Sequence, residues 1–251
     1  MLDAAQIPQR LAEALAAHRA GRLEQARSQY LQVVRAEPRH FDALHLLGVM
    51  AFQDRQPQDS LDWLDRAIAV DEANAECWSN RGLALQALDR LDEALASFDR
   101  AVFLKPDFAK AHYNRGNVLQ EMQRVDEAIA GYEAAIAIRP DFADAQLQRA
   151  QCRLLIGDFA QGWQGYEWRW QCANFAPYRR EFAQPAWRGD APLTGKTLLL
   201  YAEQGLGDTL QFCRYASLAA EAGARVVLEA NASLAGLFTD RKSTRLNSSH
   251  T

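Results

Sequence analysis

Long apolar runs, an excess of positive charge and closely spaced cysteines are all missing from this sequence. The net charge is -4 over 251 residues, with 49% hydrophobic and 24% charged residues, which is the composition of a globular protein. No local basic patch is present, so nucleic acid is not an expected partner. No apolar run approaches the roughly 18 residues that a membrane span needs.

The cysteines and the amino terminus point to a reducing compartment. Cys77, Cys152, Cys172 and Cys213 are widely separated and form no Cys-x-x-Cys motif, so we expect neither a disulfide framework nor a zinc site. The first residues lack the basic and apolar regions of a signal peptide. The 5 histidines are dispersed and add no metal cluster. The sequence therefore predicts a cytoplasmic protein with no metal site and no cofactor of its own.

What the sequence does contain is a repeat of 34 residues. Gly48, Gly82 and Gly116 are spaced by this interval, and Ala14 and Ala150 continue the series in both directions. Other positions recur in step with it, in the series Ala26, Ser60, Ala94, Ala128 and Gly162; Tyr30, Leu64, Phe98, Tyr132 and Tyr166; Val33, Ala67, Ala101 and Ala135; and Pro38, Pro106 and Pro140. A fixed period of this length indicates a repeat array.

Each repeat is predicted to be an antiparallel pair of helices. In residues 75–108, small and apolar residues follow the i, i+3, i+4, i+7 spacing of one helix face, first around Gly82 and then around Phe98. Pro106 ends the second helix because it has no amide hydrogen to donate. Gly82 and Ala94 let the two helices cross closely, and Phe98 is expected to fill the neighbouring gap. One pair cannot bury its own apolar faces, so the pairs should stack into a solenoid with a concave groove.

The repeat resembles the tetratricopeptide repeat, whose pattern is Trp-x2-Leu-Gly-x2-Tyr followed by Ala, an aromatic residue, Ala and Pro at fixed offsets. The match is strongest over residues 75–142. It weakens outward, where Arg10 and Glu13 stand at apolar positions and Glu72 replaces proline. An irregular first repeat is typical of an exposed cap. We place the array at residues 1–170, with units at about 7–40, 41–74, 75–108, 109–142 and 143–170.

In this family the first helix of each pair lines a groove, so the resemblance implies a protein or peptide partner bound there. The groove positions carried over to this sequence include His45, Gln53, Ser79, Gln86, Lys110, Tyr113, Asn117 and Gln120. Such a polar surface would hold an extended peptide through side-chain amides. The alternative is an ordinary solvated face. Asn80, Asn114 and Asn117 also resemble the asparagines of O-linked N-acetylglucosamine transferase repeats, which hold the substrate backbone.

After Asp158 the fifth unit keeps the repeat phase but replaces small residues with aromatic ones. Trp163, Tyr166 and Trp170 are expected on one helix face. Because the free end of a solenoid should turn a polar face to water, these residues predict that a second domain docks there. The alternative is a local aromatic core that only caps the array.

Residues 171–194 lose the helical period and are rich in proline, as expected for a linker. Arg179, Arg180 and Arg188 lie in this segment. They would suit an anionic ligand, or they simply face solvent.

The segment 195–239 predicts the start of a parallel α/β sheet. Residues 196–202 and 225–230 are short apolar runs typical of buried strands, and a glycine loop and an amphipathic stretch over 209–222 separate them. Neither a phosphate-binding P-loop nor a dinucleotide fingerprint fits the glycines. Ligands of such sheets bind at the carboxyl ends of the strands.

The loop from Glu203 to Asp208 resembles the first turn of heptosyltransferase-like glycosyltransferases with the GT-B fold. Together with Tyr166-Glu-Trp-Arg-Trp170, it resembles bacterial proteins that fuse tetratricopeptide repeats to such a domain. The resemblance implies that Asp208 is the catalytic base that takes a proton from the acceptor hydroxyl. Gly205 and Gly207 would let the backbone approach the substrate. The alternatives are an Asp208 that caps the helix and glycines that only permit a tight turn.

Residues 240–251 resemble the translation of a common sequencing-library adapter. We therefore expect that they do not belong to the natural protein and that the reading frame left its gene near Thr239. The alternative is a genuine basic, serine-rich tail. If the tail is an adapter, the GT-B domain is truncated and lacks the carboxyl-terminal half that mainly holds the nucleotide-sugar donor.

The predicted fold is mostly α: a tetratricopeptide-repeat α-solenoid followed by a truncated Rossmann-like α/β segment, the GT-B N-terminal half. Two functions are open. The first is the interaction solenoid of a bacterial glycosyltransferase-like protein, which uses a nucleotide sugar at full length and recruits a protein or glycan acceptor; the present chain alone would be inactive. The second is a non-enzymatic scaffold that binds a partner peptide.

Overall fold

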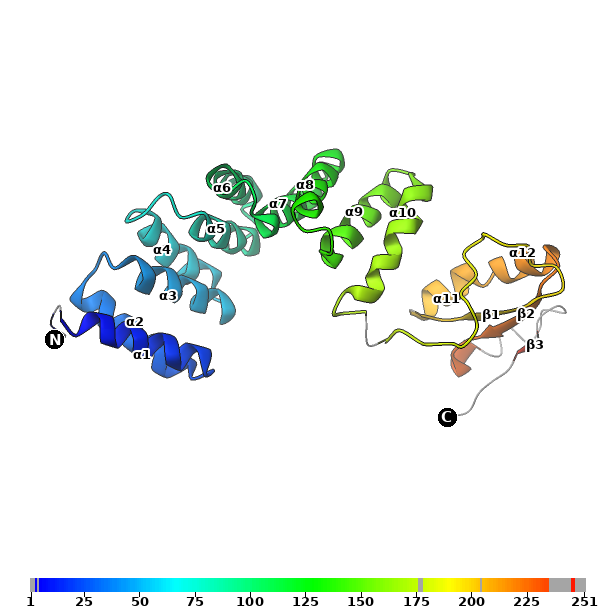
Figure 1. The fold of residues 1–251 in the computed structure, drawn as a ribbon, viewed down its shortest axis with the longest axis horizontal. Coiled ribbons are helices and arrows are strands. Elements are labelled where there is room, and N and C mark those ends of the chain that lie inside the picture. The colour runs from blue at the N-terminus through cyan, green and yellow to red at the C-terminus, as the bar shows by residue number, and fades with distance from the viewer. Residues whose placement is uncertain (1–2, 4, 176–177, 204, 235–244, 247–251) are drawn as a thin grey trace. The chain divides into compact units, whose positions relative to one another are not determined.

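The structure is a computed structural model that describes residue 3 and residues 5–175, 178–203, 205–234 and 245–246. It divides into two compact units, residues 1–176 and residues 177–251. Helices α1–α10 make up the first unit, and the strands lie in the second (Figure 1). The predicted mostly α fold class is therefore confirmed.

The first unit is a row of antiparallel helix pairs. The first helices of the pairs are α1 (Ile7–Arg19), α3 (Phe41–Gln53), α5 (Ala75–Ala87), α7 (Ala109–Glu121) and α9 (Ala143–Leu155). The second helices are α2 (Leu23–Ala36), α4 (Pro57–Ile68), α6 (Leu91–Leu104), α8 (Val125–Ile138) and α10 (Phe159–Tyr166), and the 3-10 helix η1 (Glu167–Gln171) follows. Each helix packs against the next one along the chain, and α5 also contacts α3 and α7, so the pairs stack into a solenoid (Figure 1).

A glycine in the first helix lets a side chain of the second helix pack directly on its backbone. A Cβ atom on Gly82 would lie 2.7 Å from the ring of Phe98, and one on Gly116 would lie 2.7 Å from the ring of Tyr132. Both rings are fully buried. Close packing of this kind leaves no room for a larger residue. Phe98 was expected to fill the gap beside the close crossing at Gly82, and its ring does occupy the space next to that glycine.

The turn inside each pair has the same backbone geometry. One residue of every turn has a positive φ angle, and the following residue donates its N–H to the carbonyl oxygen five residues earlier, as in a Schellman motif. The positive-φ residues are Gly21 (72°), Arg55 (59°), Asp89 (59°), Gln123 (61°) and Gly157 (85°). This conformation costs a residue with a Cβ atom about 1–2 kcal/mol. The two outer turns use glycine, whereas the three inner turns tolerate larger residues.

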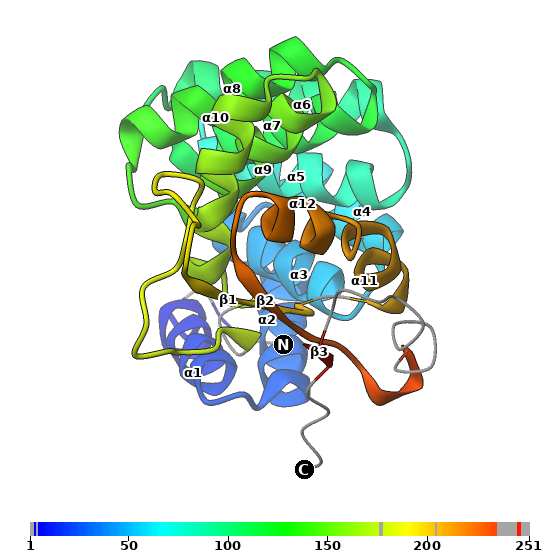
Figure 2. The ribbon, with the colours of Figure 1, turned by 90° about the vertical axis from the view of Figure 1, so that its right-hand side faces the viewer.

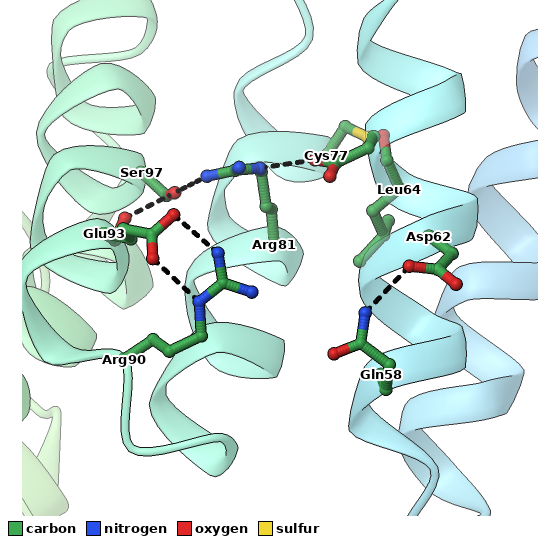
Figure 3. Close-up of polar contacts among 9 residues, drawn as sticks. Gln58, Asp62, Leu64, Cys77, Arg81, Arg90, Glu93 and Ser97 are labelled. Carbon is green, nitrogen blue, oxygen red and sulfur yellow. Dashed lines mark hydrogen bonds and ion pairs between the residues drawn. The ribbon is translucent and has the colours of Figure 1, made fainter.

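Ion pairs link neighbouring repeats at equivalent positions. The Nε atom of Arg81 on α5 lies 2.6 Å from Oδ1 of Asp65 on α4, and Arg115 on α7 makes the same contact with Asp99 on α6. Arg81 also donates to the Ser97 hydroxyl of α6 at 2.8 Å (Figure 3). One arginine thus connects three successive helices.

The second unit is built on a small parallel sheet. Its elements are β1 (Thr197–Tyr201), α11 (Leu206–Phe212), α12 (Tyr215–Glu221), β2 (Arg225–Glu229), η3 (Ala232–Leu234) and β3 (Arg245–Leu246). The strand order is β1-β2-β3, and β1 pairs with β2 from Thr197↔Arg225 to Tyr201↔Glu229. Helices α11 and α12 lie over the same face of β1 and β2 in both views (Figures 1 and 2). Ala216 and Ala219 of α12 pack with Val226 of β2.

One prediction about this unit is corrected, and another is not shown. The amphipathic stretch over 209–222 is not one helix but two, since α11 ends at Phe212 and α12 begins at Tyr215. The small residues Ala216 and Ala219 are buried there, while the large side chains Leu210 and Leu218 are exposed. The described strands form only this small sheet, so a Rossmann-like segment is not shown. Of the residues 240–251 expected to derive from an adapter, all but 245–246 lie outside the described part of the chain, and that expectation stays a prediction.

Candidate functional site

The polar residues expected to line a groove lie on α3, α5 and α7, which are consecutive first helices in contact with one another. We call the surface that they share the first-helix face. It is defined by His45, Asn80, Gln86, Tyr113, Asn117, Gln120 and Glu121. Its chemistry is set by hydrogen bonds between side chains of different repeats.

One such bond joins α3 to α5. The Nδ2 amide of Asn80 lies 2.9 Å from Nε2 of His45, so the amide donates to a neutral imidazole that carries its proton on Nδ1. Burial lowers the pKa of His45, and the carboxylates of Glu76 and Asp42 oppose this effect more weakly. The imidazole is therefore neutral at pH 7 and acts as an acceptor.

The next bond joins α5 to α7. The Nε2 amide of Gln86 donates to Oε1 of Glu121 at 2.6 Å. The two bonds together connect three repeats along one surface, so the side chains of this face hold each other in place before any ligand arrives.

On α7 the carboxamide groups are oriented from below by a buried tyrosine. The hydroxyl of Tyr132 on α8 lies 3.0 Å from Oδ1 of Asn117 and 2.7 Å from Oε1 of Gln120. Burial raises the pKa of Tyr132, so this hydroxyl stays protonated and shares its single hydrogen between the two oxygens, of which that of Gln120 is the nearer. Tyr113 packs against Tyr132 and Phe142, with ring centroids 5.9 Å and 4.9 Å apart. Among the described residues, none accepts from the Nε2 amide of Gln120.

The other predicted groove residues are placed differently. Ser79 is only 3% exposed, because it lies in the packed interior between α5 and its neighbours, and it offers no surface to a ligand. Asn114 is also buried, and within the described residues its Nδ2 atom has no hydrogen-bond partner. Gln53 and Lys110 are exposed. Sequence reasoning missed Asn80 as the partner of His45, although their spacing of 35 residues places them on adjacent first helices.

The aromatic residues at the end of the array surround an arginine. Trp163 is 54% exposed and meets Tyr166 edge-on, with centroids 5.8 Å apart. The Arg169 guanidinium lies over Tyr166 at 4.8 Å and over Trp170 at 4.3 Å, and it pairs with Glu167 at 2.8 Å. The expected single helix face is corrected: α10 ends at Tyr166, and Trp170 lies on the 3-10 helix η1. Docking of a second domain on these residues stays a prediction.

Asp208 comes seven residues after β1 ends at Tyr201, and it is not a helix cap. Gly205 is the N-cap of α11, and Asp208 is the third residue of that helix, with its side chain exposed. Neither Gly205 nor Gly207 has a positive φ angle, so the turn does not require glycine at these positions. The helix-cap and tight-turn interpretations are therefore wrong, and the catalytic role of Asp208 stays a prediction.

The linker arginines include a structural contact that the sequence did not reveal. Arg180 donates to both carboxylate oxygens of Glu229 at 2.6 Å and 3.3 Å, and its guanidinium lies over the rings of Phe182 and Tyr201. Glu229 and Tyr201 are register partners at the carboxyl ends of β2 and β1. The segment around Arg180 is thus attached to the sheet and is not a free anion-binding site.

The described residues also bear on the predictions about cysteines, metal sites and membrane spans. Cys77, Cys152 and Cys172 are buried free thiols, and burial raises the pKa of Cys77 to about 12, so this thiol is protonated and unreactive. No metal-binding group of His, Cys, Asp or Glu occurs in the described ranges. In that same part of the chain, no helix is both long and apolar enough to cross a membrane.

Comparison with known proteins supports the repeat but not the second domain. Residues 11–76 and 109–142 match the family described as tetratricopeptide repeat, and residues 87–123 match the family described as TPR repeat. No curated protein matches the chain. These matches all lie within the helical unit, and the glycosyltransferase resemblance gains no support from them.

Several solved structures share the solenoid. MamA is 25% identical with a TM-score of 0.59, over 62% of this chain and 91% of that one. The pilF protein of Pseudomonas aeruginosa is 21% identical with a TM-score of 0.59, over 64% and 74%. YrrB, described as a TPR protein with an unusual peptide-binding site, is 18% identical with a TM-score of 0.56, over 64% and 84%.

Proposed function

The chain is a tetratricopeptide repeat protein with an α-solenoid fold, and on that premise we propose that it binds an extended peptide of a partner protein on its first-helix face. The observation that carries the proposal is the set of carboxamide side chains cross-linked between repeats, from His45–Asn80 to Gln86–Glu121. An extended peptide has unpaired N–H and C=O groups along its whole length. Carboxamides supply both a donor and an acceptor for such groups.

Preorganisation makes this face a better peptide site than an ordinary solvated surface. Tyr132 holds the oxygens of Asn117 and Gln120, so the amide nitrogen of Gln120 is left to donate to a peptide carbonyl. Side chains that are already ordered lose less conformational entropy when a ligand binds. YrrB, which has the same fold, is itself described as having a peptide-binding site.

A selection from phage-displayed random 12-residue peptides tests the proposal. The enriched peptide is synthesised, and its affinity for the whole chain is measured by calorimetry. We expect Asn80→Ala and Gln120→Ala to weaken binding about tenfold each, since each removes a hydrogen bond to the peptide or its support. Gln58→Ala is the matched control, because Gln58 is an exposed amide on the second helix α4 that, within the described part of the chain, pairs only with Asp62 (Figure 3). Equal affinities in all variants would show that the peptide binds elsewhere.

A second, narrower candidate is that the unit 177–251 begins a GT-B-like glycosyltransferase domain for which the solenoid recruits a protein or glycan acceptor. The parallel pairing of β1 with β2, joined through α11 and α12, favours it, as does the position of Asp208 close after β1. The test is the genomic reading frame beyond codon 239. A following α/β domain with a nucleotide-sugar site would support this candidate, and its absence would leave the peptide-binding scaffold.

A further inference from the structure

The last helix of the array exposes apolar side chains at positions that are buried or half-buried in the preceding repeats. Leu61, Leu95, Ile129 and Trp163 occupy the same repeat position on α4, α6, α8 and α10, and Ile129 is half-buried. Leu61 and Leu95 are 3% and 9% exposed, whereas Trp163 is 54% exposed. Phe159, one turn earlier on α10, is 60% exposed. We call the surface formed by Phe159 and Trp163 the terminal face; among the described residues of its own unit, no element covers it.

In the interior of the array, the equivalent face is covered by the first helix of the next repeat. Helix α5 packs on α4, and the Sγ atom of Cys77 lies 3.8 Å from the carbonyl oxygen of Leu64. Cys77 and Ala84 are both fully buried on α5, and Ala111 and Val118 have the same spacing and burial on α7. Residues seven apart lie on one helix face, because two turns contain about 7.2 residues. The covering surface is therefore a stripe of small apolar side chains on a helix.

In the interior, acidic residues of the second helices pair with arginines of the helix that covers them. At the end of the array, the equivalent acidic residue already has a partner. Asp65 and Asp99 pair with Arg81 and Arg115 of the following first helix. The equivalent residue at the end of the array is Glu167, whose carboxylate pairs with Arg169 of the same chain at 2.8 Å. A helix that covers the terminal face therefore needs no arginine at this position, and its contact is mainly apolar.

The opposite end of the solenoid argues against a second copy stacking head to tail. On α1 the residues equivalent to Cys77 and Arg81 are Gln9 and Glu13. Gln9 donates to Glu13 at 3.1 Å, and Arg10 pairs with Glu13 at 3.1 Å. Placing this charged surface on Phe159 and Trp163 would desolvate these groups without giving them new partners.

We propose that the terminal face binds an amphipathic α-helix of a partner protein, in the place that the first helix of a further repeat would take. The partner helix carries small apolar residues seven apart, because this is what covers the same face in the interior. This helix-binding surface lies on second-helix residues and is separate from the first-helix face. The proposal rests on an exposed aromatic surface at the end of a continuous stacking interface.

The probe is a synthetic peptide with the sequence of residues 109–121, cross-linked on its solvent side to hold the helix and labelled with fluorescein. Its anisotropy is measured while the whole chain is added. We expect saturable binding that weakens about tenfold or more when Phe159 and Trp163 are both changed to Gln, as for the loss of two aromatic anchors. Phe103→Gln is the matched control, because Phe103 is 73% exposed on α6 and lies outside the terminal face. It should leave the affinity unchanged.

Three outcomes would overturn the proposal. The first is no saturable binding to the unchanged chain, as expected if a second domain occupies these residues. The second is equal binding to the double Gln variant, provided that its melting temperature is unaltered. The third is a dimer, seen by sedimentation, that the double variant abolishes and the peptide does not displace; the occupant would then be a second copy.

Discussion

The two ends of the solenoid follow the same 34-residue spacing but present opposite chemistry. At the first end, Gln9, Arg10 and Glu13 of α1 form a polar surface with its own hydrogen bond and ion pair. At the last end, Phe159 and Trp163 of α10 are more than half exposed. A repeat array needs a polar cap where it ends in water. The first end therefore presents a polar surface, whereas the last end presents an apolar one, which is the chemistry that the proposed helix binding requires.

The interior repeats give the reference for both ends. There, second helices pack on following first helices, and contacts of a glycine with a large side chain, such as Gly82 with Phe98 and Gly48 with Leu64, hold the pairs together. The largest expected difference between interior and end is therefore in packing, followed by charge, turn geometry and protonation.

Phe98→Ala and Phe159→Ala compare an interior with a terminal aromatic residue. Phe98 is fully buried, so its truncation should lower the free energy of unfolding by about 3–5 kcal/mol, through lost transfer energy and a cavity. Phe159 is 60% exposed, so the same change there should cost less than about 1 kcal/mol. Urea titration followed by circular dichroism measures both. Similar losses would mean that α10 is covered in solution.

Arg81→Ala and Arg10→Ala compare an ion pair between repeats with one inside α1. Arg81 joins Asp65 and the Ser97 hydroxyl, and its loss should cost about 1–2 kcal/mol. Arg10 pairs with Glu13 on an exposed helix surface, where such pairs contribute roughly 0–1 kcal/mol. The same titration, repeated at high salt, should bring the two variants closer together. An Arg10 effect as large as that of Arg81 would contradict the distinction.

Glycine substitution in an inner turn and glycine removal in the last turn should change the stability of the protein in opposite directions. Gln123 has a φ angle of 61°, so Gln123→Gly should stabilise the protein by about 0.5–1 kcal/mol through relief of strain. Gly157 has a φ angle of 85° in the last turn, and Gly157→Ala should destabilise by about 1 kcal/mol. Thermal melting of the two variants measures both changes in stability. A loss of stability in Gln123→Gly would show that the side chain is needed for another reason.

The smallest effect concerns the protonation of His45. Burial lowers its pKa in the folded chain, so as pH falls below about 6.5 the unfolded chain takes up the proton first. The free energy of unfolding should therefore decline below that pH and level off once the folded imidazole is also protonated. Above pH 7 both states are neutral and no effect is expected. His45→Gln should remove this component, which is visible as a smaller difference in melting temperature between pH 7.5 and pH 5.5.

Much of the helical unit could be predicted from residue spacing. Gly82, Phe98 and Pro106 recur with a fixed period, and a helix pair is a local structure that depends mainly on residues close in sequence. The first-helix positions could be carried over in the same way. What could not be predicted was the burial of Ser79 and the bond between His45 and Asn80, because both depend on how closely neighbouring repeats stack.

The second unit was harder to predict for the same physical reason. Apolar runs at Thr197–Tyr201 and Arg225–Glu229 indicate strands, but whether they pair, and with how many partners, depends on contacts between distant residues. The packing of Ala216 and Ala219 of α12 with Val226 of β2 is likewise a contact between separate elements. The contact of Arg180 with Glu229 spans 49 residues and leaves no local pattern.

The repeat length, the helix pairs and the polar character of α1 follow from the sequence alone, since period, helix-breaking residues and charge depend only on the order of residues along the chain. Tertiary structure decided which of these faces are covered. Stacking buries Leu61 and Leu95 beneath following helices, orients Asn117 and Gln120 through Tyr132, and leaves Trp163 exposed at the same repeat position. Exposure is a property of neighbours, and neighbours are set only when the repeats assemble.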